Sequence, residues 1–271
     1  MNLKEALQKK LSKKDLEFLR TSYDVIGSIA IIEIPKELVK KEKIIGNAII
    51  NLRKEVKTVC KRAGIHKGKY RTQKLTIIAG EKKKETVYRE NGCVIELNVE
   101  KVYFSPRLSN ERLRVSNLVK KGESVLVMFS GVAPYPLVIS RNAKPKEIYG
   151  IELNPHAHKY ATINVELNKL KNITLIKGDV NKVTLKKKFD RVLMPLPKSG
   201  EDFLHIALKF TKKGGIIHFY DFLHEREFDE AKKNVKEACK KAKKKCRLLN
   251  FVKCGQYGPG IFRICLDFKV L

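Results

Sequence analysis

The chain has 271 residues and 43% of them are hydrophobic, which allows one large or two modest folded domains and excludes a disordered tail. Lys and Arg number 58 against 29 Asp and Glu, so the net charge is +29 and a nucleic acid is the favoured partner, although a solvated lysine coat explains part of the excess. A membrane partner is not expected, because the sequence has no apolar stretch of transmembrane length, no signal peptide and no basic amphipathic helix with aromatic anchors. We expect a cytoplasmic protein.

The first part of the chain, residues 1–100, predicts a smaller α+β domain of a size suited to docking RNA. Its expected elements follow in chain order. They are short helices in 3–20, an apolar β-rich run over 24–34, a helical apolar spacing across 37–62, and strands over 74–80, 85–92 and 93–104.

The second part, residues 101–271, alternates strands and helices with short connections. Its expected strands are 124–129, 147–153, 173–180, 189–194, 216–222, 247–255 and 260–271, and its expected helices are 111–120, 135–142, 154–170, 201–211 and 228–246. Asn110 or Ser109 is the expected N-cap of the first helix, and KKGG (212–215) is expected to be a turn. The fold class is therefore α/β, a doubly wound, mostly parallel, Rossmann-like sheet, whose ligands bind beyond the carboxyl ends of the strands.

Polar and turn residues follow the strands of this second part in an order that suggests S-adenosylmethionine as the cofactor. FSGVAP has a single glycine, Gly131, which is too few for a pyrophosphate cradle but enough for the tight turn that a nucleoside needs. Glu152 ends the second strand, where a carboxylate can accept both ribose hydroxyls, and Asp179 ends the third, near an adenine amino group. Each residue alone is more typical of a plain turn or cap. The residues expected to line the cofactor site are Phe129, Gly131, Glu152, Leu153, Asp179, Val180, Pro195 and Pro197.

The six cysteines contain no CxxC pair and are expected to be reduced thiols. The histidines do not reach metal-ligand spacing, since His156 and His158 are two apart on a helix and point in different directions. No metal site is expected.

Six segments of the chain carry a family resemblance. They are YFSPRLSNERLRV (103–115), VLVMFSGVAP (125–134), IYGIELNPHAHKYATINVELNKL (148–170), GDV (178–180), the MPLP segment and GGIIHFYDF (214–222). Together they resemble the archaeal and eukaryotic tRNA (guanine-37 N1)-methyltransferases, from about residue 70 to the C-terminus. The resemblance implies transfer of a methyl group from S-adenosylmethionine to guanosine 37, next to the anticodon of tRNA.

The same resemblance implies a catalytic set. Glu111, in the SNERLR segment, matches the family's general base for the N1 proton. Arg71 matches, more loosely, the arginine that holds the charge growing on O6. Tyr103 and Arg107 fall at positions that line the guanosine pocket. From the residues alone, Glu111 is better explained as a first-turn helix acid, and a phosphate contact also explains Arg107.

One departure from the family concerns Pro195-Leu196-Pro197, where the family usually has Asn-Leu-Pro. Pro195 offers no donor to guanine. An archaeal subgroup that this chain resembles also methylates a tricyclic wyosine precursor at a carbon, and a pocket without the asparagine would suit that base. Two alternatives stay open. One is aminocarboxypropyl transfer in wyosine-type biosynthesis, against which Arg107-Leu108-Ser109 argues, and the other is a non-catalytic RNA-binding protein.

The expected RNA contacts lie in the dense basic and aromatic stretch KRAGIHKGKYRTQK (61–74). Lys67 and Lys69 are expected to contact the RNA backbone, and Tyr70 is expected to stack on a base. Arg112 is a further expected contact. Because the resemblance begins so near the N-terminus, we expect the additional N-terminal domain of many relatives to be absent. The sequence does not decide the oligomeric state, and a monomer is the favoured expectation.

Overall fold

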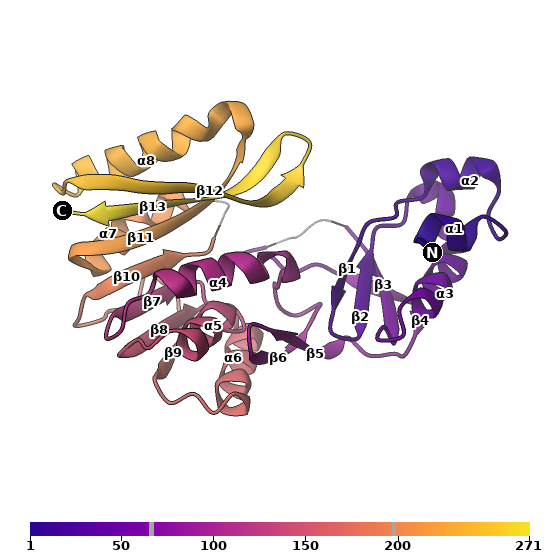
Figure 1. Ribbon diagram of the computed structural model, residues 1–271, viewed down its shortest axis with the longest axis horizontal. Helices are drawn as coiled ribbons and strands as arrows, with labels where there is room; N and C mark the ends of the chain where they lie inside the picture. Colours follow the sequence, from indigo (N-terminus) through magenta and orange to yellow (C-terminus); the bar gives the residue numbers. More distant parts are fainter. Residues whose placement is uncertain (65–67, 197–198) are drawn as a thin grey trace. The chain divides into compact units, whose positions relative to one another are not determined.

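The computed structural model describes residues 1–64, 68–196 and 199–271. The chain divides into two compact units (Figure 1). The first comprises Met1–Glu90 and Val94–Pro106, and the second comprises Asn91–Cys93 and Arg107–Leu271. Among the described helices, none is long and apolar enough to cross a membrane.

The first unit contains a four-stranded sheet with the order β1-β2-β3-β4, and β5 and β6 form a separate two-stranded sheet. Its elements are α1 (Leu3–Leu7), α2 (Lys13–Phe18), β1 (Tyr23–Ile26), β2 (Ile29–Ile32), η1 (Lys36–Lys41), α3 (Glu42–Leu52), β3 (Thr58–Arg62), β4 (Leu75–Gly80), β5 (Glu85–Glu90) and β6 (Cys93–Asn98). Helix α3 buries Ile45, Ala48 and Ile49 at helical spacing, and these side chains share a core with those of α1 and the sheet. The α+β character of this part is as predicted.

The structure divides the predicted β-rich run into two strands, and it corrects the sequence prediction at two other places in this unit. The apolar run over 24–34 is two strands, β1 and β2, joined by a turn at Gly27 (φ +55°), where an added Cβ would lie 2.3 Å from Thr86 Oγ1. Residues 58–62 form strand β3 and do not continue the helix. Strand β6 ends at Asn98 and does not reach residue 104.

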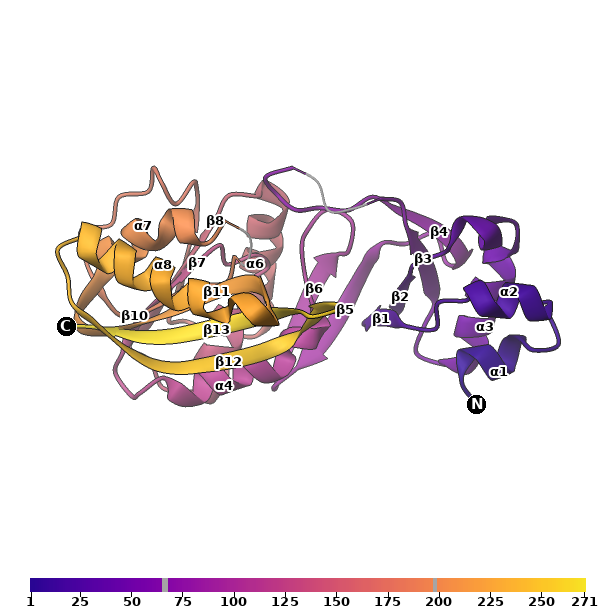
Figure 2. The same cartoon turned by 90° about the horizontal axis from the view of Figure 1, so that it is seen from above.

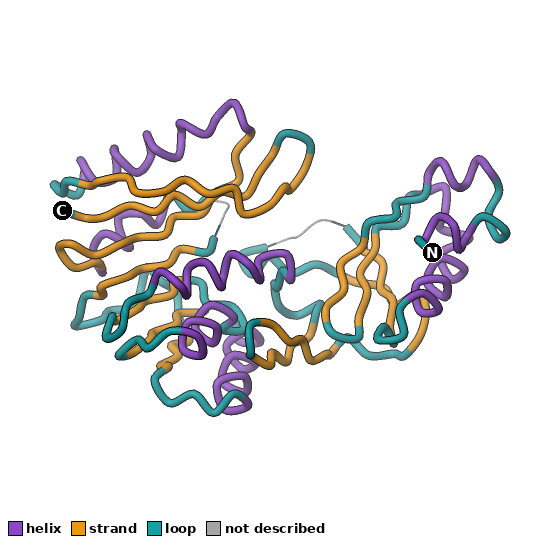
Figure 3. Tube along the Cα trace, viewed as in Figure 1, coloured by secondary structure: helices purple, strands orange, loops and turns teal. Residues whose placement is uncertain are grey.

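The second unit is built on a seven-stranded sheet with the order β12-β13-β11-β10-β7-β8-β9, whose strands from β11 to β9 are parallel. Figure 3 shows the strands of this unit in orange and its helices in purple. Its helices and strands are η2 (Pro106–Leu108), α4 (Ser109–Leu118), β7 (Ser124–Met128), α5 (Pro134–Asn142), β8 (Glu147–Glu152), α6 (Pro155–Leu167), β9 (Ile173–Lys177), β10 (Phe189–Met194), η3 (Glu201–Phe203), α7 (Leu204–Phe210), β11 (Thr211–His224), η4 (Glu225–Glu227), α8 (Phe228–Lys241), β12 (Cys246–Gly258) and β13 (Ile261–Val270). The doubly wound α/β fold class is confirmed.

Successive side chains of β7 point to opposite faces of this sheet, as the two-residue period of a strand requires. Val125 and Val127 pack in a cluster with α4 and α5, whereas Leu126 and Met128 pack in a cluster with α7 and α8. Figure 2 shows α7 and α8 on one side of the sheet and α4 on the other. Both faces are therefore covered, and the open edge for a ligand is the carboxyl end of the strands.

Two local predictions in this unit need correction. Helix α4 begins at Ser109, its N-cap is Leu108, and neither Ser109 nor Asn110 caps it with a side chain. KKGG is part of strand β11, where the pairing with β10 jumps from Thr211 to Ile216, so the predicted turn is a bulge inside the strand.

The chain passes from β7 to β8 and β9 on one side and then returns to place β10 on the other side of β7. This change of direction is the switch point at which open α/β sheets bind ligands. The segments that follow β7, β8, β9 and β10 meet at this edge.

Candidate functional site

The turn that follows β7 holds three residues in the left-handed region. Phe129, Gly131 and Ala133 have φ angles of +58°, +57° and +67°. Glycine adopts this region freely, whereas each of the other two residues is strained by about 1–2 kcal/mol. The turn is held by Ser130 N–H, which donates to the Ile151 carbonyl at 2.8 Å. Strain kept at the carboxyl end of a central strand is typical of a ligand-binding turn.

Glu152, the last residue of β8, is bonded to this turn. Its Oε2 accepts from Gly131 N–H at 2.7 Å, and its Oε1 accepts from Asn154 N–H at 2.7 Å. Burial raises the pKa of Glu152, and these backbone hydrogen bonds oppose the rise. The structure therefore brings together the glycine and the acid that the sequence suggested separately, with Leu153 half-buried beside them.

The segment after β9 is joined to the same edge. Gly178 N–H donates to the Glu152 carbonyl at 2.9 Å. The next residue, Asp179, is half-buried, and its Oδ1 accepts from Asn181 N–H at 2.9 Å. Val180 is buried in the core. Three of the predicted cofactor segments thus adjoin one another through backbone bonds.

Strand β10 ends in a three-residue turn centred on Pro195. Leu196 N–H donates to the Met194 carbonyl at 2.7 Å across it. The fixed φ of proline, near −65°, suits the centre of such an inverse γ-turn, which explains how the chain leaves the strand so abruptly. Pro195 is half-buried, and Pro197 lies outside the described residues.

The aromatic neighbour of the first turn was not predicted. The Phe203 ring lies 4.9 Å from the Phe129 ring in an edge-to-face arrangement, at an interplanar angle of 76°. The two residues are 74 positions apart, and only the sheet order brings them together.

Glu111 lies in the first turn of α4 and is 5% exposed. Arg114 donates to it from Nε to Oε2 at 2.7 Å and from Nη2 to Oε1 at 2.8 Å. The Tyr220 hydroxyl donates to Oε1 at 2.6 Å and accepts from the Tyr135 hydroxyl at 3.0 Å. Burial raises the pKa of both tyrosines, so both remain protonated donors. The carboxylate is therefore held in one orientation by charge-assisted bonds.

The other predicted catalytic residues fall in both units. Arg71 and Tyr103 belong to the first unit and are half-buried, and the Arg71 backbone lies at φ +51° with its N–H donating to the Gly68 carbonyl at 3.1 Å. Arg107 belongs to the second unit and is exposed on η2, one helical turn before Glu111.

Of the predicted RNA contacts, Lys69 and Tyr70 are exposed, with the Lys69 ammonium 5.3 Å from the centre of the Tyr70 ring. Lys67 lies outside the described residues. Arg112 is only 2% exposed. A phosphate therefore reaches Arg112 only after the groups that cover it move, and its role as an RNA contact stays a prediction.

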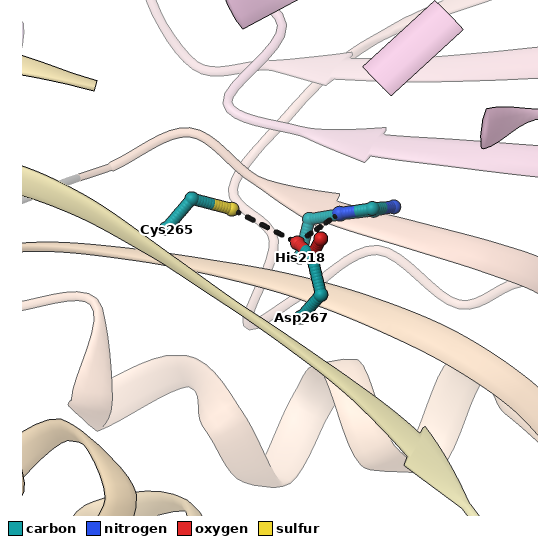
Figure 4. Close-up of side chains that lie close together, drawn as sticks. All are labelled: His218, Cys265 and Asp267. Carbon is teal, nitrogen blue, oxygen red and sulfur yellow. Dashed lines mark hydrogen bonds and ion pairs between the residues drawn. The ribbon is translucent and has the colours of Figure 1, made fainter. Parts of the chain in front are cut away.

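A further cluster of side chains, on β11 and β13, was not predicted (Figure 4). His218 Nδ1 lies 2.6 Å from Asp267 Oδ1, and the Cys265 thiol donates to the same oxygen at 3.2 Å. The potential ligand atoms of these residues all lie within 4.8 Å of one another. Two arginines donate into the cluster, Arg114 to Asp267 Oδ2 at 2.7 Å and Arg191 to His218 Nε2 at 2.8 Å. Because two guanidinium groups repel a cation, we interpret the cluster as a hydrogen-bonded network.

Comparisons with known proteins agree with this geometry. Residues 86–249 match the model of the TRM5/TYW2 methyltransferase domain, and residues 3–83 match that of the TYW2 N-terminal domain. The match to residue 3 corrects the expectation that the resemblance begins near residue 70.

Individual relatives cover most of the chain. The tRNA (guanine(37)-N(1))-methyltransferase Trm5b of Pyrococcus abyssi is 41% identical over 254 residues, which is 93% of this chain and 76% of the relative. The tRNA (guanine(37)-N(1))/4-demethylwyosine(37)-methyltransferase Taw22 of Nanoarchaeum equitans is 38% identical, over 79% of this chain and 88% of the relative. A solved complex of aTrm5 with tRNALeu superposes with a TM-score of 0.89 at 35% identity, over 100% of this chain and 78% of that one. The chain belongs to the TRM5/TYW2 methyltransferase family.

Proposed function

We propose that this protein transfers a methyl group from S-adenosylmethionine to N1 of guanosine 37 in tRNA. The observation that carries the proposal is the cradle at the switch point, where a left-handed turn and the Glu152 carboxylate are joined through Gly131. Relatives named for this reaction, and the family itself, support it.

The residues at this edge fit the cofactor. Glu152 is the last residue of β8, and its carboxylate can accept hydrogen bonds from ribose hydroxyls. Asp179 lies two residues after the end of β9, and its carboxylate can accept a hydrogen bond from the adenine amino group. Phe129, Leu153 and Val180 supply apolar surface for the adenine ring. S-adenosylmethionine supplies a methyl group on a sulfonium that departs as a neutral thioether, so the transfer requires no metal.

In this proposal Glu111 accepts the N1 proton, because the N1 lone pair is unavailable for methylation while the proton remains. Arg71 then holds the negative charge that grows on O6, and Tyr103 and Arg107 line the guanosine pocket. Arg114 and Tyr220 hold the Glu111 carboxylate in one orientation.

The burial of Glu111 places a requirement on this mechanism. Its side chain is 4% exposed, so a guanine reaches the carboxylate only after the groups that cover it move. The same burial also fits a purely structural role for Glu111. A substitution that removes activity while preserving folding and cofactor binding separates the two roles.

The proposal assigns different tasks to the two parts of the sequence. Residues 1–100 dock the tRNA, with Lys69 and Tyr70 at the exposed surface, and residues 101–271 perform the transfer. The strong positive charge supports a polyanionic substrate. We place the enzyme in the cytoplasm with its tRNA substrate and expect it to act as a monomer.

The test is transfer of label from methyl-labelled S-adenosylmethionine to two tRNA transcripts, one with guanosine and one with adenosine at position 37. We expect label on the first transcript only, in the form of 1-methylguanosine. Mass spectrometry of the product nucleoside distinguishes a methyl group from an aminocarboxypropyl group. A protein that binds the cofactor but labels neither transcript would contradict the proposal.

A second substrate is favoured by Pro195, which sits where the family usually has a guanine-contacting asparagine and offers no donor. The relative from Nanoarchaeum equitans is named for both guanosine 37 and 4-demethylwyosine 37. We propose that this enzyme also methylates the tricyclic base at a carbon. Incubation with tRNA that carries 4-demethylwyosine tests this idea, and the absence of methyl transfer would refute it.

A further inference from the structure

We propose that Asp267 is a positioning residue that sets the proton affinity of Glu111 by sharing Arg114 with it. Its relevance to catalysis rests on the proposed function, whereas its effect on Glu111 does not. Asp267 lies on β13, at the far end of the sequence from α4, and its side chain is hydrogen-bonded to Arg114, His218 and Cys265.

The geometry shows one guanidinium between two carboxylates. Arg114 donates from Nε and Nη2 to Glu111, at 2.7 and 2.8 Å, and from Nη1 and Nη2 to Asp267, at 2.7 and 3.3 Å. The side chains of Glu111 and Asp267 are only 4% and 2% exposed, so water screens neither charge. Burial alone would lower the pKa of Arg114. The hydrogen bonds to Glu111 and Asp267 outweigh this effect and raise the pKa.

The opposite side of Asp267 keeps it ionised. Arg191 Nη1 donates to His218 Nε2, so this nitrogen carries a lone pair and the proton lies on Nδ1, which donates to Asp267. His218 is therefore neutral, in agreement with burial lowering its pKa. Burial alone would raise the pKa of Asp267, but the bonds from His218 and Arg114 hold it well below its usual range. Glu123 Oε2 accepts from Arg191 Nε at 2.7 Å and balances that charge near the surface.

Among the titratable groups around Glu111, we assign the effect on its proton affinity to Arg114 and Asp267. Tyr220 on β11, Tyr135 on α5, Cys254 on β12 and Cys265 on β13 all have pKa values raised by burial and stay neutral. Arg112 on α4 keeps a constant positive charge.

The consequence concerns the strength of the base. A lone Arg114 cation would stabilise the ionised Glu111 carboxylate and make it a poor proton acceptor. The Asp267 carboxylate takes part of that cation's hydrogen bonding and opposes its charge, so Glu111 binds a proton more readily. A more basic Glu111 removes the N1 proton of guanine more easily.

The test compares Asp267→Asn with the matched control Asp190→Asn, which neutralises another carboxylate of the same sheet, paired with Lys212 and Ser124. Carbon-13 NMR of proteins labelled at the glutamate carboxyl carbons gives the titration midpoint of Glu111, whose signal is identified by its loss in Glu111→Gln. Single-turnover methyl transfer to the guanosine 37 transcript, measured across pH, gives the catalytic effect.

We expect Asp267→Asn to lower the Glu111 midpoint by about one pH unit or more, and Asp190→Asn to leave it unchanged. In the pH profile of the transfer rate, the acid limb should move to lower pH together with the midpoint. The rate on the plateau should fall about threefold for each pH unit by which the midpoint falls. An unchanged midpoint in Asp267→Asn would overturn the inference. A midpoint that moves while the acid limb stays would overturn its catalytic part.

Two further results keep the test decisive. If wild type transfers no methyl group, the proposed function fails, while the midpoint still decides whether Asp267 controls Glu111. If Asp267→Asn does not fold, as judged by circular dichroism, nitrogen-15 NMR of His218 in the wild type decides the matter. A neutral ring protonated at Nδ1 supports the network, and a charged ring or a proton on Nε2 overturns it.

Discussion

Asp221 and Asp190 belong to neighbouring parallel strands, yet the folded protein shifts their proton affinities in opposite directions. Burial raises the pKa of Asp221 to about 6, against one opposing hydrogen bond from Phe222 N–H, and the charges of Glu201 and Glu230 add to the rise. Burial would also raise the pKa of Asp190, but hydrogen bonds from Lys212 and Ser124 outweigh it and lower the pKa to about 2. The two carboxylates therefore contribute to stability with opposite signs.

Asp221→Asn should stabilise the protein at neutral pH. The folded pKa of Asp221 lies above its unfolded value near 3.9, so the wild type loses stability as pH rises from about 4 to about 6 and stays penalised above that. The neutral asparagine removes the penalty. We expect the Tm at pH 7.5 to rise by a few degrees and the Tm at pH 4 to stay unchanged. A lower Tm at pH 7.5 would contradict this assignment.

Asp190→Asn should have the opposite effect. The folded pKa of Asp190 lies below its unfolded value, so its ionised form contributes stability above pH 4 that is lost as pH falls towards 2. We expect a lower Tm at pH 7.5, with the difference from wild type shrinking on acidification. Thermal melts of both variants across the same buffers check the two signs together.

At this scale the sequence predicts residue types better than contacts. The acid after β8 was predicted from its position, but its bond to Gly131 depends on the sheet order. Arg112 and Arg114 look alike in SNERLR, and only the α4 packing buries the first and aims the second at Glu111. The Arg114–Asp267 pair spans 153 positions, a separation that no local pattern reveals.

At the scale of elements, the left-handed turn after β7 makes a paired prediction. Gly131→Ala introduces a Cβ at φ +57° and should destabilise the protein by about 1–2 kcal/mol and weaken cofactor binding. Ala133→Gly removes a Cβ at φ +67° and should stabilise it by about 0.5–1 kcal/mol, since the relief of strain exceeds the entropic cost of glycine. Urea unfolding and calorimetry with S-adenosylmethionine measure both effects. If the free energy of unfolding changed in the same direction in both variants, the interpretation of this turn as strained would be contradicted.

The elements that the sequence predicted well are those with a strong period of their own. Alternating strands and helices from β7 to β11 were found because each buried strand is bounded by turn residues. Strand β3 was missed because Val56 and Val59 continue the apolar spacing of the preceding helix, although both pack in the core. The bulge in β11 was read as a turn because a run of two lysines and two glycines is locally typical of one.

At the scale of the whole molecule, the charge of +29 makes a prediction about tRNA binding. Contacts to phosphates release counterions, so with about five such contacts the affinity should fall about ten- to twentyfold for each doubling of the salt concentration. Binding of S-adenosylmethionine should change little over the same range and serves as the control. Fluorescence anisotropy with labelled tRNA at several salt concentrations measures the slope. A flat dependence would mean that the lysine excess is a solvated coat.

The central claim is that Glu111 accepts the N1 proton during methylation of guanosine 37. The most direct measurement is the single-turnover rate of 1-methylguanosine formation by wild type and Glu111→Gln, with folding and cofactor binding checked for both. The account predicts formation by wild type and a loss of about a hundredfold or more in Glu111→Gln, with cofactor affinity retained. A Glu111→Gln protein that folds, binds the cofactor and methylates at the wild-type rate would contradict it and leave Glu111 with a structural role.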